Sequence, residues 1–376
     1  MKIALVHDYF YVFGGAERVL QALKEIWPQA PVYTAWVDWP WLKQHQPDWQ
    51  NWQIIPSWFD KLAFKRKLCS PLRFLAPKIW SSFDLSAFDV VISSSAWYMS
   101  KGVSLSRKKN SKKPLHICYC HTPPRYLYGY PTAFDYQRSW LIKLYAALIN
   151  PFLRYYDFNS SQAVDFFIAN SREVQQRINK FYRCQAEVIY PPIFSKTKTR
   201  TIKTNHQNYF LMVNRLVGPK NVSLAIKICQ KLNLALKIVG NGPEEKKLKQ
   251  QAKTSQLIEF LGDVDDNKLA QLYANCQAVL YLAEQEDFGI IPVEAMSFGK
   301  PVIGLNSGGV KESIKPSKTG ILINKPYQQN LLKTLKNFNP KLFKASDCLA
   351  QAEKFSQARF KQLIKAFVED KYQKSQ

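Results

Sequence analysis

The sequence predicts an α/β protein built from two doubly wound domains. Short apolar strands alternate with amphipathic helical stretches along most of the chain, a pattern typical of parallel sheets covered by helices. The alternation stops at residues 196–208, which are polar, basic and nearly free of apolar residues, and it then restarts. We therefore expect an N-terminal Rossmann-like domain (1–195), a linker (196–208), a second Rossmann-like domain (209–355) and a C-terminal helix (356–376) that packs back on the first domain. A cleft is expected between the domains.

The individual strands are short apolar runs bounded by polar or turn-forming residues. In the first half they are expected at Ile3–Val6, Val90–Ser93, His116–Cys120 and Phe166–Ala169. In the second half they are expected at Tyr209–Val213, Ala235–Val239, Ile258–Leu261, Ala278–Leu282 and Val302–Leu305, with helices at Val222–Leu232, Asn267–Asn275 and Ser356–Lys371. Ligands of open α/β sheets bind beyond the carboxyl ends of the strands, so functional residues are sought directly after these runs.

Composition restricts the class of protein. The chain has 53 Lys and Arg against 28 Asp and Glu, a formal charge of +25, which attracts nucleic acid, anionic lipid or phosphorylated substrates. Seven scattered cysteines without a disulfide-type spacing favour a reducing, cytoplasmic environment. The first apolar run is too short for a signal peptide, and no run reaches the roughly 18 apolar residues of a spanning helix. The longest candidate, Leu141–Leu153, is interrupted by polar residues and Pro151.

Two glutamates follow the strand that ends at Leu282, in the run EDFGIIPVEAMSFGKPV. Pro292 suits a first helical turn and Gly299 a helix end, which predicts a helix at Pro292–Phe298 with Glu286 before it and Glu294 in its first turn. Backbone N–H groups of Phe288–Ile290 can hold phosphate or sugar oxygens, and carboxylates accept hydrogen bonds from paired hydroxyls. A solvated Glu286 and a Glu294 that only favours the helix dipole are the alternative. The succession of strand, loop, helix and strand favours a binding site.

Two cations follow the strand Tyr209–Val213. Arg215 and Lys220 lie in NRLVGPKN, on a loop that enters a helix, and such a pair suits a diphosphate. A solvated basic turn is the alternative, but the position on the same sheet edge as Glu286 favours binding. The runs NSGGVKES and GNGPEE also follow strands, and their glycines permit close backbone approach.

Taken together, these motifs resemble the retaining glycosyltransferases of family 4, which have the GT-B fold. The resemblance rests on EDFGIIPVEAMSFGKPVI, NRLVGPK, GNGP, FLGDV and SGGVKE, in the family's order. It implies that Arg215 and Lys220 bind the donor diphosphate and that Glu294 binds the ribose. It also implies that Glu286 contacts the donor sugar near the reacting carbon. The remaining donor contacts implied by the family pattern are the backbone of Asp287, Phe288, Gly289 and Ile290, and the glycine loop at Gly14 and Gly15.

The first half narrows the resemblance. CYCHTPPRYLYGY is similar to the O-antigen-type mannosyltransferases, which implies an active-site role for His121, added charge from Arg125, and GDP-mannose as the donor. The resemblance further implies retention of configuration, no metal or other cofactor, and a glycan or lipid-linked acceptor in cell-surface polysaccharide synthesis. A core histidine and a zinc site with His116, Cys118 and Cys120 are the alternatives. Zinc is disfavoured because neighbouring strand residues face opposite ways and no second cluster completes a site.

The basic surface has two interpretations that the sequence leaves open. Residues 58–80 mix cations with aromatic and aliphatic side chains, and 106–113 reads SRKKNSKK. Such segments suit an anionic membrane surface, with a peripheral location at the inner face of the plasma membrane, or a solvated basic face. Other readings of the whole chain are another GT-B enzyme, such as a UDP- or ADP-sugar transferase or an epimerase, and a nucleic-acid-binding protein. The sequence argues against nucleic acid because it contains no recognisable binding motif.

Overall fold

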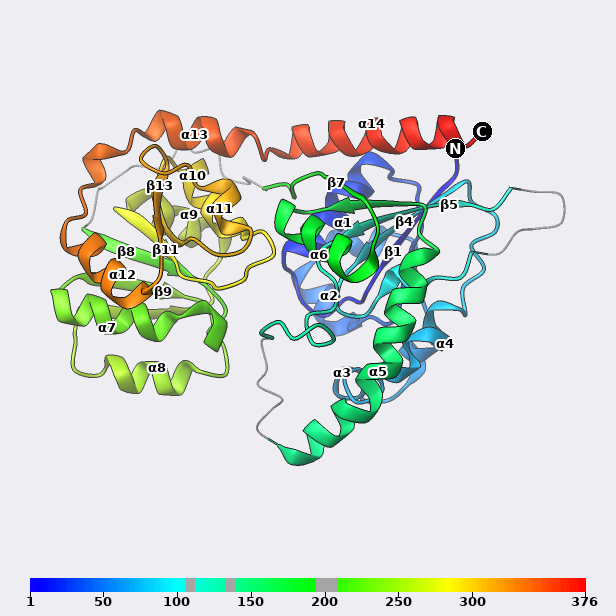
Figure 1. Cartoon of the computed structure of the whole chain (residues 1–376), viewed down its shortest axis with the longest axis horizontal. Helices are drawn as coiled ribbons and strands as arrows, with labels where there is room; N and C mark the ends of the chain where they lie inside the picture. Colours follow the sequence, from blue (N-terminus) through cyan, green and yellow to red (C-terminus); the bar gives the residue numbers. More distant parts are fainter. Residues whose placement is uncertain (106–111, 133–138, 194–207) are drawn as a thin grey trace. The chain divides into compact units, whose positions relative to one another are not determined.

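The computed structural model describes residues 1–105, 112–132, 139–193 and 208–376, which fall into two compact units (Figure 1). Unit 1 comprises residues 1–130, 135–192 and 357–376, and unit 2 comprises residues 131–134 and 193–356. The expected linker lies outside the described residues except for Asn208, and so does most of the basic run 106–113.

Unit 1 is built on a seven-stranded parallel sheet with the order β3-β2-β1-β4-β5-β6-β7. Its strands are β1 (Ile3–His7), β2 (Val32–Thr34), β3 (Ile54–Pro56), β4 (Val90–Ser95), β5 (Leu115–Cys120), β6 (Phe166–Ala169) and β7 (Ala186–Val188). The central strands β1, β4 and β5 are buried along their whole length. That burial explains their apolar sequences, because helices cover both faces of a parallel sheet.

The helices of unit 1 include the C-terminal one. They are α1 (Gly15–Ile26), α2 (Trp39–His45), α3 (Lys65–Leu68), α4 (Ala76–Trp80), α5 (Trp140–Gln162), α6 (Arg172–Tyr182) and α14 (Gln357–Ser375), with short 3₁₀ turns η1 (Pro47–Asn51), η2 (Trp58–Lys61), η3 (Arg73–Leu75) and η4 (Ser100–Gly102). Helix α14 packs against α1 and β5. Lys361 forms an ion pair with Glu25 of α1, and the Phe360 ring meets the Tyr119 ring of β5 at 5.9 Å.

Unit 2 has a six-stranded parallel sheet with the order β10-β9-β8-β11-β12-β13. Its strands are β8 (Tyr209–Val213), β9 (Ala235–Val239), β10 (Ile258–Gly262), β11 (Ala278–Tyr281), β12 (Val302–Leu305) and β13 (Gly320–Ile323). Its helices are α7 (Val222–Leu232), α8 (Glu245–Ala252), α9 (Asp266–Asn275), α10 (Ile290–Ser297), α11 (Val310–Ser313), α12 (Tyr327–Lys336) and α13 (Ala345–Glu353), with 3₁₀ turns η7 (Gly218–Lys220) and η8 (Pro340–Leu342).

Both sheets have the strand order of a doubly wound fold, with a topological switch point at their centre. The switch lies between β1 and β4 in unit 1 and between β8 and β11 in unit 2. At such a point the two loops that leave the sheet turn to opposite faces and open a crevice at the carboxyl edge. The Rossmann-like class expected from the sequence is therefore present in each unit, and each switch point marks where a ligand is expected.

The structure corrects several expectations. Four strands were not predicted from the sequence, β2, β3, β7 and β13, which are three or four residues long. The helix expected at Pro292–Phe298 is α10 and begins at Ile290, so Glu294 lies in its second turn rather than its first. Pro292 is tolerated as the third helical residue because the first N–H groups of a helix have no intrahelical acceptor.

The run Leu141–Leu153, whose apolar sequence is interrupted by polar residues and Pro151, belongs to one continuous helix, α5. A proline at this position removes the hydrogen bond to the carbonyl of residue 147. Packing of the second half of the helix outweighs that loss, since Leu153 and Asp157 are fully buried. Among the described residues, no helix is both long enough and apolar enough to cross a membrane.

A buried ion pair fixes α5 to the rest of unit 1. Lys101 of η4 pairs with Asp157 of α5, and both side chains are almost fully buried. The same carboxylate accepts hydrogen bonds from the hydroxyls of Tyr128 at 2.8 Å and Tyr182 at 3.2 Å. The Lys101 ammonium also lies 4.8 Å from the centre of the Tyr182 ring. Each buried charge is thus compensated, as burial of ions requires.

We expect Lys101→Ala to lower the free energy of unfolding of unit 1 by about 3–5 kcal/mol, because it leaves the Asp157 carboxylate buried without its cation. All ten tryptophans lie within residues 1–140, so tryptophan fluorescence during urea denaturation reports on unit 1. The matched control is Lys374→Ala, which removes an exposed pair with Asp370 in α14 of the same unit and should leave the denaturation midpoint close to that of wild type. Equal effects of the two variants would contradict this prediction.

Candidate functional site

An ion pair joins the two loops at the switch point of unit 2. Lys220, at the end of η7 after β8, pairs with Glu286 in the loop after β11. The Lys220 Nζ also lies 3.3 Å from the Tyr281 hydroxyl at the end of β11. Two residues that are 66 positions apart in the chain are thus brought into direct contact at the carboxyl edge of the sheet.

This pair keeps Lys220 charged. Burial alone lowers the pKa of the Lys220 ammonium, but the charge of Glu286 outweighs that effect and the pKa is raised above its usual value. Burial, followed by the charge of Glu286, also raises the pKa of Tyr281, so the phenol stays neutral. The result is a largely buried cation that remains protonated throughout the physiological range, which is the property needed to stabilise phosphate oxygens.

The glycines of the runs NSGGVKES and GNGPEE allow these loops to pack closely together. Gly308 has φ +62°, and a Cβ there would lie 2.4 Å from the carbonyl oxygen of Glu286. The Gly309 N–H donates to the same carbonyl at 2.8 Å, and the Gln285 N–H donates to Ser307 Oγ at 3.0 Å. The loop after β12 therefore supports the Glu286 loop through direct backbone contact, which side chains at 308 and 309 would prevent.

The loop after β9 supports the Arg215 loop in the same way. Gly240 has φ +112°, and a Cβ there would lie 2.2 Å from the carbonyl oxygen of Asn214. The Leu216 N–H donates to the Asn241 carbonyl at 2.9 Å. On the other side, the Asn221 side chain donates to the Leu282 carbonyl at 3.0 Å. The loops after β8, β9, β11 and β12 thus form one braced edge.

Glu294 occupies a different position from Glu286. It is 8% exposed, on α10, and its Oε2 accepts a hydrogen bond from the Tyr273 hydroxyl of α9 at 3.2 Å. Gly289 (φ +81°) precedes the first residue of α10, Ile290. Gly299 (φ +71°) follows the end of the helix, as the motif predicted. The Tyr273 ring stacks on Phe298, which fixes the hydroxyl that faces Glu294.

The other expected donor contacts of unit 2 lie on the same edge. Arg215 is the second residue after β8, and Asp287 and Phe288 lie between Glu286 and α10. Phe288 is 3% exposed, and its ring lies 5.4 Å from that of Phe355. Its side chain therefore anchors the loop to the core, so its expected role in binding falls to the backbone.

In unit 1 the structure builds a buried polar chain around His121. His121 Nε2 lies 2.8 Å from Ser94 Oγ, which lies 3.2 Å from His7 Nδ1. His7 Nε2 is 3.5 Å from Glu17 Oε1, and Glu17 Oε2 accepts the Gly14 N–H at 2.8 Å. This series of polar contacts therefore runs from the glycine loop after β1, through β1 and β4, to the residue that follows β5.

The contacts favour one arrangement of protons along this series of polar groups. His7 Nε2 has no hydrogen-bond partner among the described residues but lies at ion-pair distance, 3.5 Å, from the Glu17 carboxylate, which favours the His7 proton on Nε2. His7 Nδ1 then accepts from the Ser94 hydroxyl. The Ser94 oxygen then accepts from His121 Nε2–H, which leaves His121 Nδ1 as a hydrogen-bond acceptor. The tautomer is assigned here from the contacts. Burial, and then the proximity of His7, lower the pKa of His121 to about 3, so it acts as a neutral group.

The remaining expected residues of unit 1 lie on nearby loops. Gly14 and Gly15 mark the start of α1, and a Cβ at Gly15 would meet no atom within 4 Å. Arg125 is half-buried in the turn after His121, where its carbonyl accepts the Tyr130 N–H at 3.0 Å. His121, Gly14 and Gly15 thus gather at one edge, and Lys220, Glu286, Arg215 and Glu294 belong to the edge of the other unit.

The residues considered for zinc are engaged in packing. His116 Nε2 lies 2.9 Å from Ser93 Oγ, while Cys118 and Cys120 are part of an apolar cluster with Phe167 and Val174. Within the described ranges, no group of three His, Cys, Asp or Glu side chains is placed to hold a metal ion.

Comparison with known proteins assigns the chain to a family. The model of Glycosyltransferase Family 4 matches residues 13–194, and the model of glycosyl transferases group 1 matches residues 194–345. The chain belongs to the family 4 glycosyltransferases. It is 28% identical over 268 residues to alpha-1,3/1,6-mannosyltransferase ALG2 of Homo sapiens, covering 62% of the chain and 61% of that protein. It is 26% identical over 321 residues to ALG2 of Dictyostelium discoideum, covering 72% of each.

Solved structures support the fold of this glycosyltransferase. HepE of Anabaena, determined in complex with UDP and glucose, superposes with a TM-score of 0.69 at 18% identity, covering 98% of the chain and all of that protein. Sucrose-phosphate synthase of Thermosynechococcus elongatus gives a TM-score of 0.72 at 15% identity, covering 99% of each. The GT-B fold expected from the sequence is thereby confirmed.

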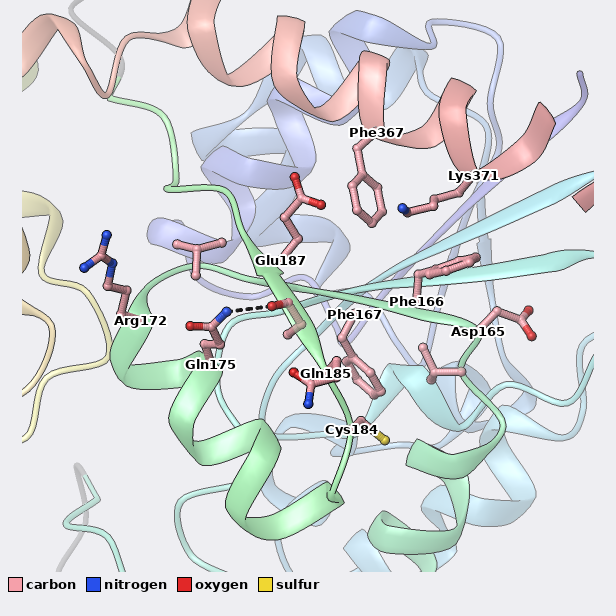
Figure 2. Close-up of a pocket in the computed structure, with 13 residues that line it drawn as sticks. Asp165, Phe166, Phe167, Arg172, Gln175, Cys184, Gln185, Glu187, Phe367 and Lys371 are labelled. Carbon is pink, nitrogen blue, oxygen red and sulfur yellow. Dashed lines mark hydrogen bonds between the residues drawn. The ribbon is translucent and has the colours of Figure 1, made fainter. Parts of the chain in front are cut away.

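A surface hollow of about 1000 Å³ lies elsewhere in unit 1 of the glycosyltransferase (Figure 2). The hollow lies along the edge strand β7, and residues of α6 and α14 also line it. None of the expected site residues is part of the lining. Gln175 donates to the Ala186 carbonyl at 2.7 Å, and Glu187 and Lys371 add charge around the strand. These polar groups are the usual protection of a sheet edge against pairing with another chain.

Several residues of the two edges have no motif that points to them. Tyr281 and Tyr273 read only as apolar members of a strand and a helix. Glu17, however, follows Gly14 at the spacing of a capping box, and Ser93–Ser95 end a buried strand with polar residues. A search for polar side chains at the carboxyl ends of buried strands would therefore have found His7 and Ser94.

We expect unit 1 of the glycosyltransferase to lose stability as the pH falls below about 6.5. Burial, followed by the charges of Lys113 and Lys101, lowers the pKa of His116 to about 3. Between the ordinary value and this one, the unfolded chain binds a proton that the folded chain does not, so folding becomes less favourable. Above pH 6.5 both states are neutral and the effect is absent.

The measurement is urea denaturation, followed by tryptophan fluorescence, at pH 7.5 and 5.5. His116→Gln, which can keep a hydrogen bond to Ser93, should lose on the order of 1 kcal/mol less than wild type between these pH values. His45→Gln, at an exposed position, is the control and should lose as much as wild type. An identical pH response of His116→Gln and wild type would contradict the prediction.

Proposed function

We propose that the chain is a retaining hexosyltransferase that moves mannose from GDP-mannose to a hydroxyl of a glycan or lipid-linked acceptor. The observation that carries this proposal is the Lys220–Glu286 pair at the switch point of unit 2, directly before the N-terminus of α10. A protonated lysine and a helix N-terminus at the carboxyl edge of a doubly wound sheet are suited to a nucleoside diphosphate.

The two residues of the pair contact different parts of the donor, the diphosphate and the sugar. The Lys220 ammonium stabilises the negative charge that builds on the diphosphate as the glycosidic bond breaks, and Arg215 adds a second, bidentate cation. Glu286 accepts hydrogen bonds from the donor sugar hydroxyls, and Glu294 from the ribose. In this scheme cationic side chains take the place of a metal ion.

Unit 1 contributes neutral groups. The polar chain from Glu17 to Ser94 holds the His121 ring so that Nδ1 is a hydrogen-bond acceptor for a sugar hydroxyl. Attack by the acceptor occurs from the face that the diphosphate leaves, and the leaving phosphate accepts the acceptor's proton. Because the chemistry forms an oxocarbenium-like sugar, electrostatic stabilisation of the leaving group is the largest contribution.

The proposed identities of the sugar and the acceptor are based on the relatives. The ALG2 proteins of two organisms are named as mannosyltransferases, and the motif around His121 resembles a mannosyltransferase branch. We propose that the acceptor belongs to cell-surface polysaccharide synthesis and that the enzyme works in the cytoplasm, peripherally at the inner face of the plasma membrane.

We expect Lys220→Ala to lower kcat by about 10²–10³, as the loss of one preorganised donor does in other enzymes. The assay is release of nucleoside diphosphate, and urea denaturation confirms that the variant is folded. Lys237→Ala, which removes a lysine–glutamate pair with Glu259 on the same unit, is the matched control and should keep the wild-type rate. A wild-type kcat for Lys220→Ala would refute the assigned role.

Thermal-shift measurements with GDP-mannose, UDP-glucose, UDP-GlcNAc and ADP-glucose test the donor. At about one hundred times Kd, the true donor adds about 2.7 kcal/mol of stability, so GDP-mannose should raise Tm and the others should not. Stabilisation by a UDP- or ADP-sugar alone would replace the proposed donor with that one. Absence of any shift, with salt-dependent binding to random DNA, would support the nucleic-acid alternative instead.

A further inference from the structure

A stripe of apolar side chains on α5 faces solvent. Leu141, Leu144, Leu148, Phe152 and Tyr155 follow one another at intervals of three or four, which places them on one side of the helix. Their exposed fractions are 58%, 52%, 69%, 51% and 69%. A stripe at this spacing normally faces a core, and an exposed apolar patch of this kind marks an interaction site.

The stripe stands on a rigid support. The second half of α5 is fixed by the buried Lys101–Asp157 pair and by Leu153, which is fully buried. The first half extends away from the sheet of unit 1 (Figure 1). At its beginning, Trp140 is 70% exposed, and aromatic rings of this type favour the boundary between water and lipid. The exposed stripe is therefore part of a well-anchored helix.

The basic segment 61–80 lies beside this helix. Arg73 Nη2 donates to Asn150 Oδ1 at 3.1 Å, and the Arg73 guanidinium lies 4.7 Å from the centre of the Tyr145 ring. The Tyr145 hydroxyl donates to the Pro71 carbonyl. These contacts join residues 61–80 and 139–156 into one surface, which we call the docking face.

Cations outnumber carboxylates on the docking face. Residues 61–80 contain six Lys and Arg, residues 139–156 contain two, and neither segment contains Asp or Glu. Lys65 is paired with Asp60 at 2.6 Å and Arg66 with Asp38 at 3.5 Å, whereas Lys67 and Lys143 are exposed. Phe64, within the basic run, is 74% exposed and adds a further apolar side chain. Apolar and cationic groups thus alternate over the same area.

We propose that the docking face binds an anionic lipid bilayer. The α5 stripe enters the boundary between headgroups and acyl chains, and the surrounding Lys and Arg side chains contact lipid phosphates. Helices with an apolar face and basic flanks bind bilayers in this orientation, and the two contributions add. A second copy of the chain fits poorly, because two such faces would bring sixteen cations together, and only Lys65 and Arg66 of each set are paired with a carboxylate among the ion pairs described.

This inference deepens the proposed use of a lipid-linked acceptor and rests on it only for its biological purpose. It goes beyond the basic segment recognised in the sequence, because the apolar stripe lies on α5, in a different part of the chain. The binding itself requires neither a sugar donor nor an acceptor, so it is measured separately from the reaction.

Co-sedimentation with vesicles tests the proposal. Wild type should bind vesicles of phosphatidylcholine with phosphatidylglycerol, bind phosphatidylcholine alone far less, and lose binding as salt is raised. Leu148→Ser with Phe152→Ser should weaken binding by about tenfold or more, because both side chains leave the lipid phase. The matched control is Leu342→Ser with Leu257→Ser, which changes unit 2 leucines that are 70% and 43% exposed and should bind as wild type does.

A second pair of variants tests the charge. Lys67→Glu with Lys143→Glu should weaken binding and reduce its salt dependence, whereas Lys246→Glu with Lys247→Glu, on exposed positions of α8, should bind nearly as wild type. Donor-induced thermal shifts should be the same in all four variants, so a failed donor assignment is distinguished from failed docking.

The proposal is wrong if wild type does not bind anionic vesicles at low salt, or if the control variants lose as much binding as the docking-face variants. It is also wrong if size-exclusion chromatography shows a wild-type dimer that Leu148→Ser with Phe152→Ser converts to a monomer without a change in vesicle binding. In that case the face is an interface between two copies of the chain.

Discussion

The ion pair between Lys220 and Glu286 is the contact on which the candidate site of unit 2 depends. It joins the loops after β8 and β11, which leave the sheet at its switch point, and it keeps a lysine protonated in a largely buried position. A buried lysine without a partner would lose its charge, because desolvation favours the neutral form. The carboxylate therefore preserves the cation, and a diphosphate that binds there meets a charge already in place.

The pair works only if both loops hold their shape, and the glycines provide this. Gly308 and Gly240 adopt positive φ and lie against neighbouring backbone too closely for any side chain. Short motifs that look like ligand-binding glycine loops are here part of the support of other loops. Replacing one of these glycines would therefore displace the loop that carries Glu286 or Arg215, although neither of those residues is changed.

The sequence allowed the strands with long apolar runs to be predicted, and β6, β8, β9 and β12 have the expected limits. It allowed Lys220 and Glu286 to be placed on one sheet edge, because carboxyl ends of parallel strands meet there. It could not show their direct contact, which depends on the path of two loops. It also missed β2 and β7, which are too short to give a pattern, and it did not predict α5, whose continuity through Pro151 depends on tertiary packing.

The two units differ in the charge of their edges, and this difference has a chemical consequence. The edge of unit 2 presents a lysine whose pKa is raised, whereas the edge of unit 1 presents His121, whose pKa is lowered to about 3. In the proposed function a neutral imidazole at position 121 suits a sugar hydroxyl, because a protonated ring would oppose the positive charge that the sugar gains. The cationic edge suits a leaving group that gains negative charge. Each edge thus matches one charge that develops in the proposed reaction.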